Sequence, residues 1–300
     1  MTYMGVHKKI NVQKLRSEHL LKKNSTDHHY IPIFFSKGFV NSHGLLYVYD
    51  KNKNEIQTQQ KSPKSVFFEA DRNTVDVIGT QQSSALEDIY YKKIDDEASL
   101  IIRKLRNEVA DNPHVEIGDI EHFLRFLIKL YWRIPATDIT SSDVIDRTKI
   151  MSDSISPEKL RDDQTFRKLL RSQIAYHTLK QIELSPIDTI STPSLRQFPK
   201  DIFVLGDNPL VYRTAPKLFR EFGETDLMIA ISSSRIFSLT SVKMKVFERS
   251  KAMMYNAFII HQSLRYVVCS DRNILTEAVT SYNECIRRGD LLQCPDMIFS

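Results

Sequence analysis

Residues 84–109 read SALEDIYYKKIDDEASLIIRKLRNEV and carry the clearest secondary-structure pattern in the chain. Their apolar side chains recur at intervals of three and four residues, which places them on one face of an α-helix. Ser84 and Glu87 have the spacing of a capping box at the start of this stretch. We therefore predict one long amphipathic helix over these residues.

Two more helices are predicted further along the chain. Asp119 suits the first turn of one of them, and Pro135 ends its apolar face. The other begins at about Pro157, a residue suited to a first helical turn, and its apolar pattern continues to Leu179. Together the three helices predict a helical layer.

A β-hairpin is predicted before the long helix. Residues 44–50, which read GLLYVYD, form a β-rich run, and residues 51–54 and 55–59 supply a polar turn and a return strand. Later apolar runs predict strands at residues 202–205, 210–212, 227–231, 236–239 and 266–269. Helices are expected near residues 246–263 and 274–287. We predict an α+β fold, in which a helix-rich N-terminal part with the β-hairpin is followed by a mixed strand/helix C-terminal part.

Composition changes along the chain suggest its organisation. Residues 1–24 form a basic arm, and residues 25–184 hold the hairpin and the helical layer. Residues 185–199 contain three prolines and no periodicity, so we interpret them as a linker before residues 200–300. A single continuous domain remains an alternative, because motifs in both parts could share one site.

The net charge of the chain is concentrated in the arm. Residues 1–24 hold six lysines and arginines against Glu18 alone, a surplus that equals the +5 of the whole chain. Such an arm could bind nucleic-acid phosphates, or it could be a solvated segment that aids solubility. The arm lacks the apolar core of a secretory signal, and no apolar run reaches the roughly 18 residues of a membrane span. We expect no membrane partner.

The three cysteines, Cys269, Cys285 and Cys294, form no C-x-x-C pair. An odd number of cysteines without that spacing favours reduced thiols over disulfides or a zinc ribbon, so we expect a cytoplasmic protein. The eight glycines fit neither G-x-G-x-x-G, nor a P-loop, nor G-x-S-x-G, and the chain has no H-E-x-x-H. Dinucleotide binding, P-loop hydrolysis and ordinary α/β-hydrolase chemistry are therefore disfavoured.

His28 and His29, which follow Asp27, are the first candidate site residues. Neutral imidazoles can act as metal ligands or as a general base. If this segment is helical, only one of the two can face a given site, because successive residues diverge by about 100°. The structural alternative is that one histidine packs against nearby phenylalanines while the other is solvated.

Asp207 and Asn208 stand in the sequence Gly-Asp-Asn-Pro, directly after an apolar run. A carboxylate and an amide at a strand end could ligate a metal or orient water, although the same residues are also ordinary turn formers. Glu69 and Asp71 place two carboxylates on one side of an extended chain, near Arg72.

Arg133 lies near the end of an apolar helix, beside Trp132, the single tryptophan of the chain. Its guanidinium could pair with a carboxylate or with a bound anion, and a structural salt bridge is the more ordinary role.

These pieces, taken in order, resemble a bacterial family known as domain of unknown function 4238. The likeness covers roughly residues 27 to 270 and includes His28-His29-Tyr30-Ile31-Pro32, Phe35, Phe39, residues 46–50, Ser62-Pro63, Glu69, Asp71, Leu86-Glu87, Arg133-Ile134-Pro135, Asp207-Asn208-Pro209 and Asn256. The chain departs from the family pattern at residues 35–39, where a leucine and a basic residue are usual. The resemblance implies no particular reaction. It suggests a protein of bacteria and their mobile elements, with a role in phage conflict as a conjecture.

Two functions remain open from the sequence. The first is a hydrolase, perhaps a metal-dependent nuclease, with His28, His29, Arg133 and Asn208 as catalytic residues. Its divalent metal would be held by His29, Glu69, Asp71 and Asp207. The second is a non-catalytic binding or sensor protein that uses the basic arm, residues 1–24.

Overall fold

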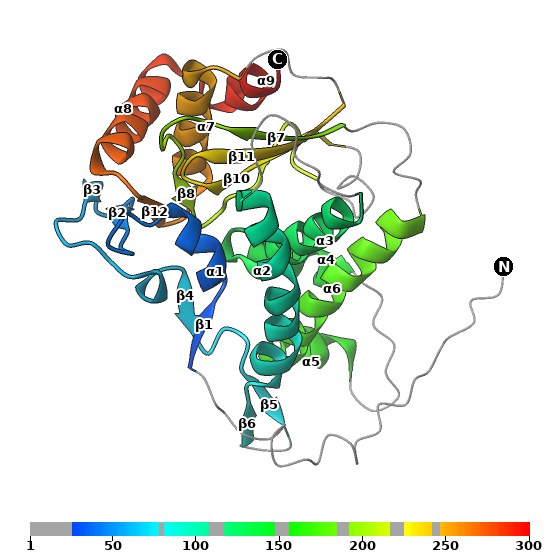
Figure 1. Cartoon of the computed structure of the whole chain (residues 1–300). Coiled ribbons are helices and arrows are strands. Elements are labelled where there is room, and N and C mark those ends of the chain that lie inside the picture. The colour runs from blue at the N-terminus through cyan, green and yellow to red at the C-terminus, as the bar shows by residue number, and fades with distance from the viewer. Residues whose placement is uncertain are drawn as a thin grey trace.

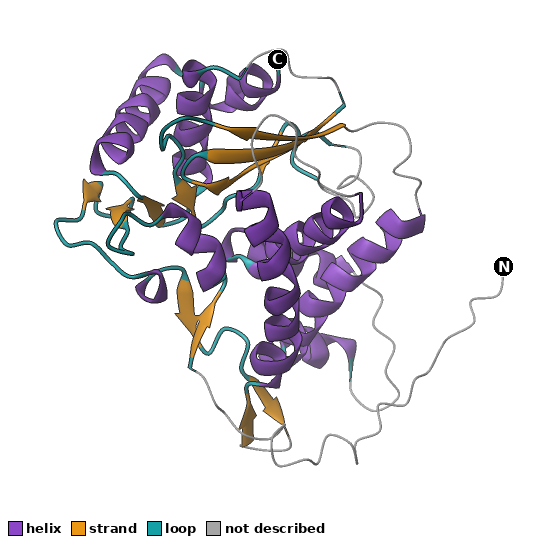
Figure 2. Cartoon of the chain, viewed as in Figure 1, coloured by secondary structure: helices purple, strands orange, loops and turns teal. Residues whose placement is uncertain are grey.

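The computed structural model describes residues 26–77, 81–107, 117–147, 156–184, 192–216, 225–241 and 247–300. The basic arm, residues 1–24, lies outside this part of the chain. Figure 1 shows a four-stranded sheet between two groups of helices, with a second four-stranded sheet beside it. Figure 2 shows the helices gathered above and below the strands of the first sheet. The predicted α+β fold is confirmed.

The first sheet is antiparallel and has the strand order β7-β11-β10-β9. Its strands are β7 (Thr192–Gln197), β9 (Val211–Tyr212), β10 (Leu227–Ser232) and β11 (Arg235–Thr240). Helix α7 (Arg249–Gln262) lies on one side of this sheet, and helices α2 (Lys92–Asn107) and α3 (Ile117–Arg133) lie on the other (Figure 1). Every residue of β11 is buried, as expected for a strand covered on both faces.

Strand β7 corrects the interpretation of residues 185–199 as a linker. Residues 192–197 pair with β11 along the whole length of both strands, with Pro193 opposite Leu239. Proline is tolerated there because β7 is an edge strand, where one side of the backbone needs no partner. Residues 185–191 lie outside the described part of the chain.

The second sheet joins the two parts of the chain. Its order is β3-β2-β12-β8, formed by β2 (Tyr47–Asp50), β3 (Glu55–Ile56), β8 (Leu205–Gly206) and β12 (Tyr266–Cys269). The antiparallel pair β2–β3 confirms the predicted hairpin. Residues 202–204, which were predicted to belong to a strand, precede β8 without pairing, because the backbone N–H groups of Ile202 and Phe203 donate to Ser233 O instead.

The helical group contains a π-helix at Leu86–Tyr91 and then α2, α3, α4 (Asp138–Arg147), α5 (Pro157–Asp162) and α6 (Gln164–Leu184). None of the described helices is long and apolar enough to cross a bilayer. The capping box predicted at Ser84 and Glu87 does not form. The Ser84 hydroxyl donates to Asp88, and the Glu87 carboxylate accepts from Asn73 and Arg133, which are distant in sequence.

The helix predicted from Pro157 is two helices, α5 and α6. Ser156 caps the first, because its hydroxyl oxygen accepts from Lys159 N at 3.4 Å. Asp163 ends it with an extended backbone (ψ 116°). The Asp163 carboxylate then accepts from Phe166 N at 2.7 Å, as an N-cap does, so the chain begins a new helix there.

Apart from helix α8, which has 17 residues, the remaining elements are short. They are β1 (Asp27–His29), α1 (Ile33–Ser36), β4 (Phe68–Ala70), β5 (Val75–Val77), β6 (Gln81–Ser83), α8 (Arg272–Arg288), α9 (Cys294–Phe299) and single 3-10 turns at Lys37–Phe39, Pro63–Ser65, Pro135–Thr137 and Leu291–Gln293. Strand β1 pairs with β4, and β5 pairs with β6, each in antiparallel fashion. Helix α8 packs against α7 and against the second sheet.

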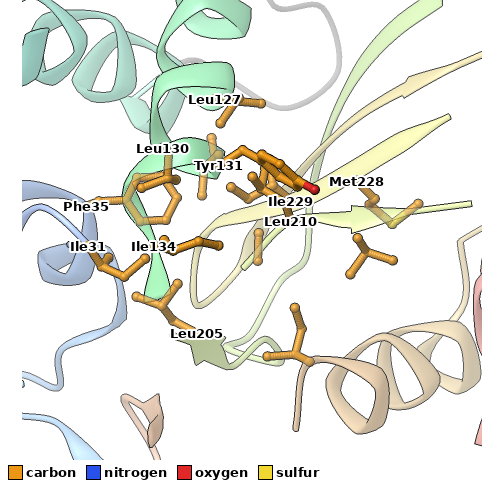
Figure 3. Packing of buried hydrophobic residues seen from close by; sticks show 14 of the residues in the cluster. Ile31, Phe35, Leu127, Leu130, Tyr131, Ile134, Leu205, Leu210, Met228 and Ile229 are labelled. Carbon is orange, nitrogen blue, oxygen red and sulfur yellow. The ribbon is translucent and has the colours of Figure 1, made fainter. Parts of the chain in front are cut away.

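The buried apolar side chains form one cluster that includes both parts of the chain. Figure 3 shows Ile31 and Phe35 beside Leu130 and Ile134 of the α3 region, with Leu205 close by. Each such side chain contributes about 1.5–3 kcal/mol when it is fully removed from water. Strands after residue 200 and helices before residue 184 therefore stabilise each other.

Gly38 lies in close contact with the side chain of Arg106. An alanine Cβ at Gly38 would lie 2.3 Å from Arg106 Nη2. The Arg106 guanidinium cannot easily retreat, because it donates to three backbone carbonyls, those of Phe34, Phe35 and Ile231, at 2.6–2.9 Å.

We expect Gly38→Ala to lower the free energy of unfolding by about 1–3 kcal/mol, the usual cost of overpacking. Gly118→Ala is the matched control, because nothing lies within 4 Å of its added Cβ. That control should leave stability unchanged or raise it by up to about 1 kcal/mol, since alanine favours helix. Urea unfolding of both variants measures the difference, and equal shifts would contradict the proposed steric conflict.

Candidate functional site

The histidine pair lies on β1, where His28 stands opposite Glu69 of β4. Successive strand residues point to opposite faces, so His28 is fully buried while His29 is half-buried. His28 Nδ1 accepts a hydrogen bond from the backbone N–H of Asn73 at 2.8 Å. His29 Nε2 donates to Lys64 O at 3.1 Å, and its ring packs against Phe68. The two imidazoles therefore lie in different environments, His28 in the interior and His29 partly exposed.

Burial lowers the pKa of His29 below 6.5, and the hydrogen bond to Lys64 O only partly opposes this. The unfolded chain therefore takes up a proton first as the pH falls, and the stability contributed by the neutral ring is lost below about pH 6.5. We expect the stability difference between the native protein and His29→Gln to shrink between about pH 7.5 and about pH 5.5. Urea unfolding across this range measures it, and a constant difference would contradict the assignment.

Glu87 and Arg133 form the buried centre of the site. Arg133 Nη1 donates to both carboxylate oxygens of Asp95 at 2.8 and 2.9 Å, and Nη2 donates to Glu87 at 3.2 Å. Asn73 Nδ2 donates to the other Glu87 oxygen at 2.7 Å. The Arg133 guanidinium also lies 4.5 Å above the ring of Tyr91. Burial opposes its charge, but the Asp95 and Glu87 carboxylates outweigh burial and raise the pKa of Arg133.

Arg72 joins this centre to the molecular surface. Its Nε donates to Arg133 O at 3.0 Å, and its Nη1 donates to Glu69 at 2.6 Å. Both Nη atoms also donate to Asp138, at 2.7 and 3.0 Å, which is the two-pronged pairing typical of arginine and carboxylate. Arg171 donates to the same Asp138 at 3.3 Å and to Asn73 Oδ1 at 2.7 Å.

We refer to these connected side chains as the arginine network: Arg72, Arg133 and Arg171 with Glu69, Asn73, Glu87, Asp95 and Asp138. It links the turn after β4 with the π-helix, α2, α3, α4 and α6. His28 is attached to the network through the backbone of Asn73.

A cleft of about 350 Å³ opens beside the network, between the turn after β4, helix α4 and helix α6. This volume is within the range of small-molecule sites, about 300–1,000 Å³. Its charged lining residues are Glu69, Asp71, Arg72, Asp138, Arg167, Lys168 and Arg171. Basic groups therefore outnumber acidic ones on its walls.

Lys168 is a cation in this cleft that backbone carbonyls hold, while the Asp76 and Asp71 carboxylates act on it without direct contact. Its Nζ donates to the backbone carbonyls of Asp71 and Thr74 at 3.0 and 2.8 Å, and no carboxylate of the described residues forms a salt bridge with it. Burial and then the neighbouring Arg171 guanidinium lower the pKa of Lys168. An ammonium group has three N–H donors, so one donor remains beyond these two bonds.

Asp207 and Asn208 belong to a separate structural turn. The Asp207 carboxylate accepts from the backbone N–H groups of Leu264, Arg265 and Tyr266 at 2.7–2.9 Å. The Gln262 side chain donates to Asn208 O at 2.6 Å. These contacts bind the turn after β8 to the chain between α7 and β12, the turn-forming role that the sequence left open.

The structure thus connects some of the predicted site residues and separates others. His28, Glu69 and Arg133 lie in or on the arginine network, and Asp71 lines the cleft beside it. The predicted metal ligands are not gathered into one site. Among the described residues, no group whose ligand atoms all lie within 4.8 Å of one another is formed by His29, Glu69, Asp71 and Asp207.

Sequence reasoning missed Asp138, Lys168 and Arg171, which complete the cleft. One signal was available, because Arg167, Lys168 and Arg171 follow one another at helical spacing and lie on one side of α6. Their carboxylate partner, Asp138, had no local signal, since it is 33 residues from Arg171.

One protein-family model matches residues 27–273. The chain belongs to the DUF4238 family. The description of that family is a protein of unknown function. The DUF4238 match begins in β1 and ends in α8, so it includes the arginine network and the whole cleft. No curated protein and no solved structure matches the chain.

Proposed function

We propose that this DUF4238 protein binds a small phosphate-bearing ligand, such as a mononucleotide, in the cleft between the turn after β4, α4 and α6. The observation that carries the proposal is the half-buried Lys168 ammonium, which donates to backbone carbonyls and forms no salt bridge with a carboxylate of the described residues. An anion in the cleft would supply the missing negative charge and accept the third N–H. Arg167 and Arg171 stand on the same helix beside Lys168. Each pairs with one carboxylate, Asp146 and Asp138 respectively, and each guanidinium has further N–H donors that an anion could use.

The arginine network supports this role by fixing the walls of the cleft. Asp138 on α4 is held by two arginines, one from the turn after β4 and one from α6. The three elements are therefore positioned before a ligand arrives. Preorganisation of this kind increases affinity because less freedom is lost on binding.

Calorimetric titration of the full chain with a mononucleotide tests the proposal. Lys168→Met removes the charge but keeps most of the aliphatic stem, and we expect it to weaken binding at least about tenfold, since a charged hydrogen bond contributes about 1.5–3 kcal/mol. Lys92→Met is the matched control, because Lys92 lies on the exposed surface of α2 and pairs with Asp96. Binding should also weaken as the salt concentration rises.

Two further proteins make the result unambiguous. Arg167→Met serves as a second cleft variant if Lys168→Met lowers the melting temperature. Deletion of residues 1–24 tests the basic arm as the binding site. Equal affinities of Lys168→Met and Lys92→Met, or loss of binding only on deletion of the arm, would contradict the cleft as the site.

A hydrolase acting on the bound phosphate ester is the second proposal. It is supported by Glu69 and Asp138, whose carboxylates are about 45% and 41% exposed and flank Arg72 in the same cleft. A carboxylate next to a bound ester could act as a general base, with a divalent ion supplied in solution.

The test compares phosphodiester turnover, with and without divalent cations, in Glu69→Gln and in the surface control Glu121→Gln. Glu69→Gln leaves the pair of Arg72 with Asp138 intact, so it should fold. Loss of turnover in Glu69→Gln alone would support the hydrolase. Turnover that is absent or equal in both variants would reject Glu69 as the base.

A further inference from the structure

Two cysteines and an aspartate meet at the C-terminal end of the molecule, away from the cleft. The ligand atoms of Cys285, Asp290 and Cys294 all lie within 4.8 Å of one another. Among the described residues, these three are the group of His, Cys, Asp or Glu side chains whose ligand atoms lie close enough together to hold a metal ion. They lie beyond the family match, which ends at residue 273.

Local chain geometry brings these residues together. Helix α8 ends at Gly289, whose left-handed backbone (φ 73°) lets the chain reverse. The N–H of Asp290 then donates to Cys285 O at 3.2 Å, which places Asp290 beside the last turn of α8. A single 3-10 turn, Leu291–Gln293, follows and positions Cys294 as the first residue of α9.

The Asp290 carboxylate is incompletely satisfied. Its Oδ1 is buried and accepts no N–H or O–H hydrogen bond from the described residues, and the group that interacts with the carboxylate is the neighbouring Cys285 thiol. A buried carboxyl oxygen whose hydrogen-bonding capacity is incompletely used is costly, and it requires an explanation. A cation bound by this oxygen and by the two thiolates provides one.

We propose that Cys285, Asp290 and Cys294 bind one zinc-like divalent cation. Two thiolates select a borderline-soft ion such as Zn²⁺ over Mg²⁺ or Ca²⁺, which prefer oxygen ligands. Tetrahedral Zn²⁺ with Zn–S bonds of about 2.3 Å requires ligand atoms nearly 4 Å apart, so a contraction of at most about 1 Å completes the site. Cys285 and Asp290 are partly exposed, which lets water occupy the fourth position.

Binding involves no redox change. The cation displaces the two thiol protons to solvent, as metal ligation by cysteine generally does. The consequence is structural: the ion ties α8 to α9, and α9 packs on α7 beside the first sheet (Figure 1).

Zinc content per chain, measured by mass spectrometry after addition of Zn²⁺ and dialysis, tests the site. We expect one equivalent in the full chain and in Cys269→Ala, the control that removes the third thiol. Asp290→Asn and Cys294→Ser should bind at least about tenfold more weakly, since loss of one ligand exceeds about 1.4 kcal/mol. Substitution with Co²⁺ should give thiolate-to-metal charge-transfer absorption that is absent in Cys294→Ser.

Asp290→Asn keeps the size of the side chain, and the buried Oδ1 has no backbone N–H partner among the described residues to lose. Zinc binding that is equal in all four proteins, or no binding in the full chain, would overturn the site. A Cys285–Cys294 disulfide in protein purified without reductant, seen as the loss of two thiols that persists with Zn²⁺, would overturn it as well.

Discussion

Arg133→Met should lower the free energy of unfolding by about 3–5 kcal/mol, because it removes one partner of a buried ion pair. Arg133 is 2% exposed, and its loss leaves the carboxylates of Asp95 and Glu87 in the interior without their cation. Arg103→Met on the exposed surface of α2 is the matched control. Urea unfolding measures both variants, and the control should change stability by less than about 0.5 kcal/mol.

A double variant identifies the cause of that loss. When Asp95 is replaced by leucine together with Arg133→Met, one of the orphaned charges is also removed. The double variant should therefore be more stable than the sum of the two single changes predicts. Strict additivity would show that Arg133 acts through packing, for example on the ring of Tyr91, and not through its carboxylate partners.

Asp207→Ala should lower the free energy of unfolding by about 2–4 kcal/mol, since it removes the side-chain acceptor of three backbone N–H groups. Asp143→Ala, at an exposed position of α4, is the control and should have little effect. Thermal and urea unfolding measure the change. A stable Asp207→Ala protein that loses a cellular or enzymatic effect would contradict the structural role and favour Asp207 as a functional residue.

These predictions follow from contacts that differ in how far the sequence reveals them. Periodicity identified the helical layer and the β2–β3 hairpin, because each needs only local apolar spacing to bury one face. Strand β7 was missed because an edge strand tolerates proline and needs no apolar run. The division between α5 and α6 at Asp163 was missed because one capping carboxylate decides it.

The candidate site was recoverable only in part. His28, Glu69 and Arg133 were identified by residue type. Glu69 pairs with the nearby Arg72, but the partners of His28 and Arg133, Asn73 and Asp95, come from distant positions. Pairing between residues that are 38 to 66 positions apart leaves no periodic pattern in a single sequence. Asp207 has a local sequence signal that is ambiguous, because an Asp-Asn-Pro pattern fits both a metal ligand and a turn. The structure shows that the carboxylate oxygens of Asp207 accept hydrogen bonds from three backbone N–H groups.

A crystal structure of the full chain soaked in inorganic phosphate tests the central claim most directly. We predict an ordered anion in the cleft, hydrogen-bonded to Lys168 Nζ and close to the guanidinium of Arg167 or Arg171. A well-ordered cleft that contains no anion at saturating phosphate, with Lys168 still bonded only to Asp71 O and Thr74 O, would contradict the account.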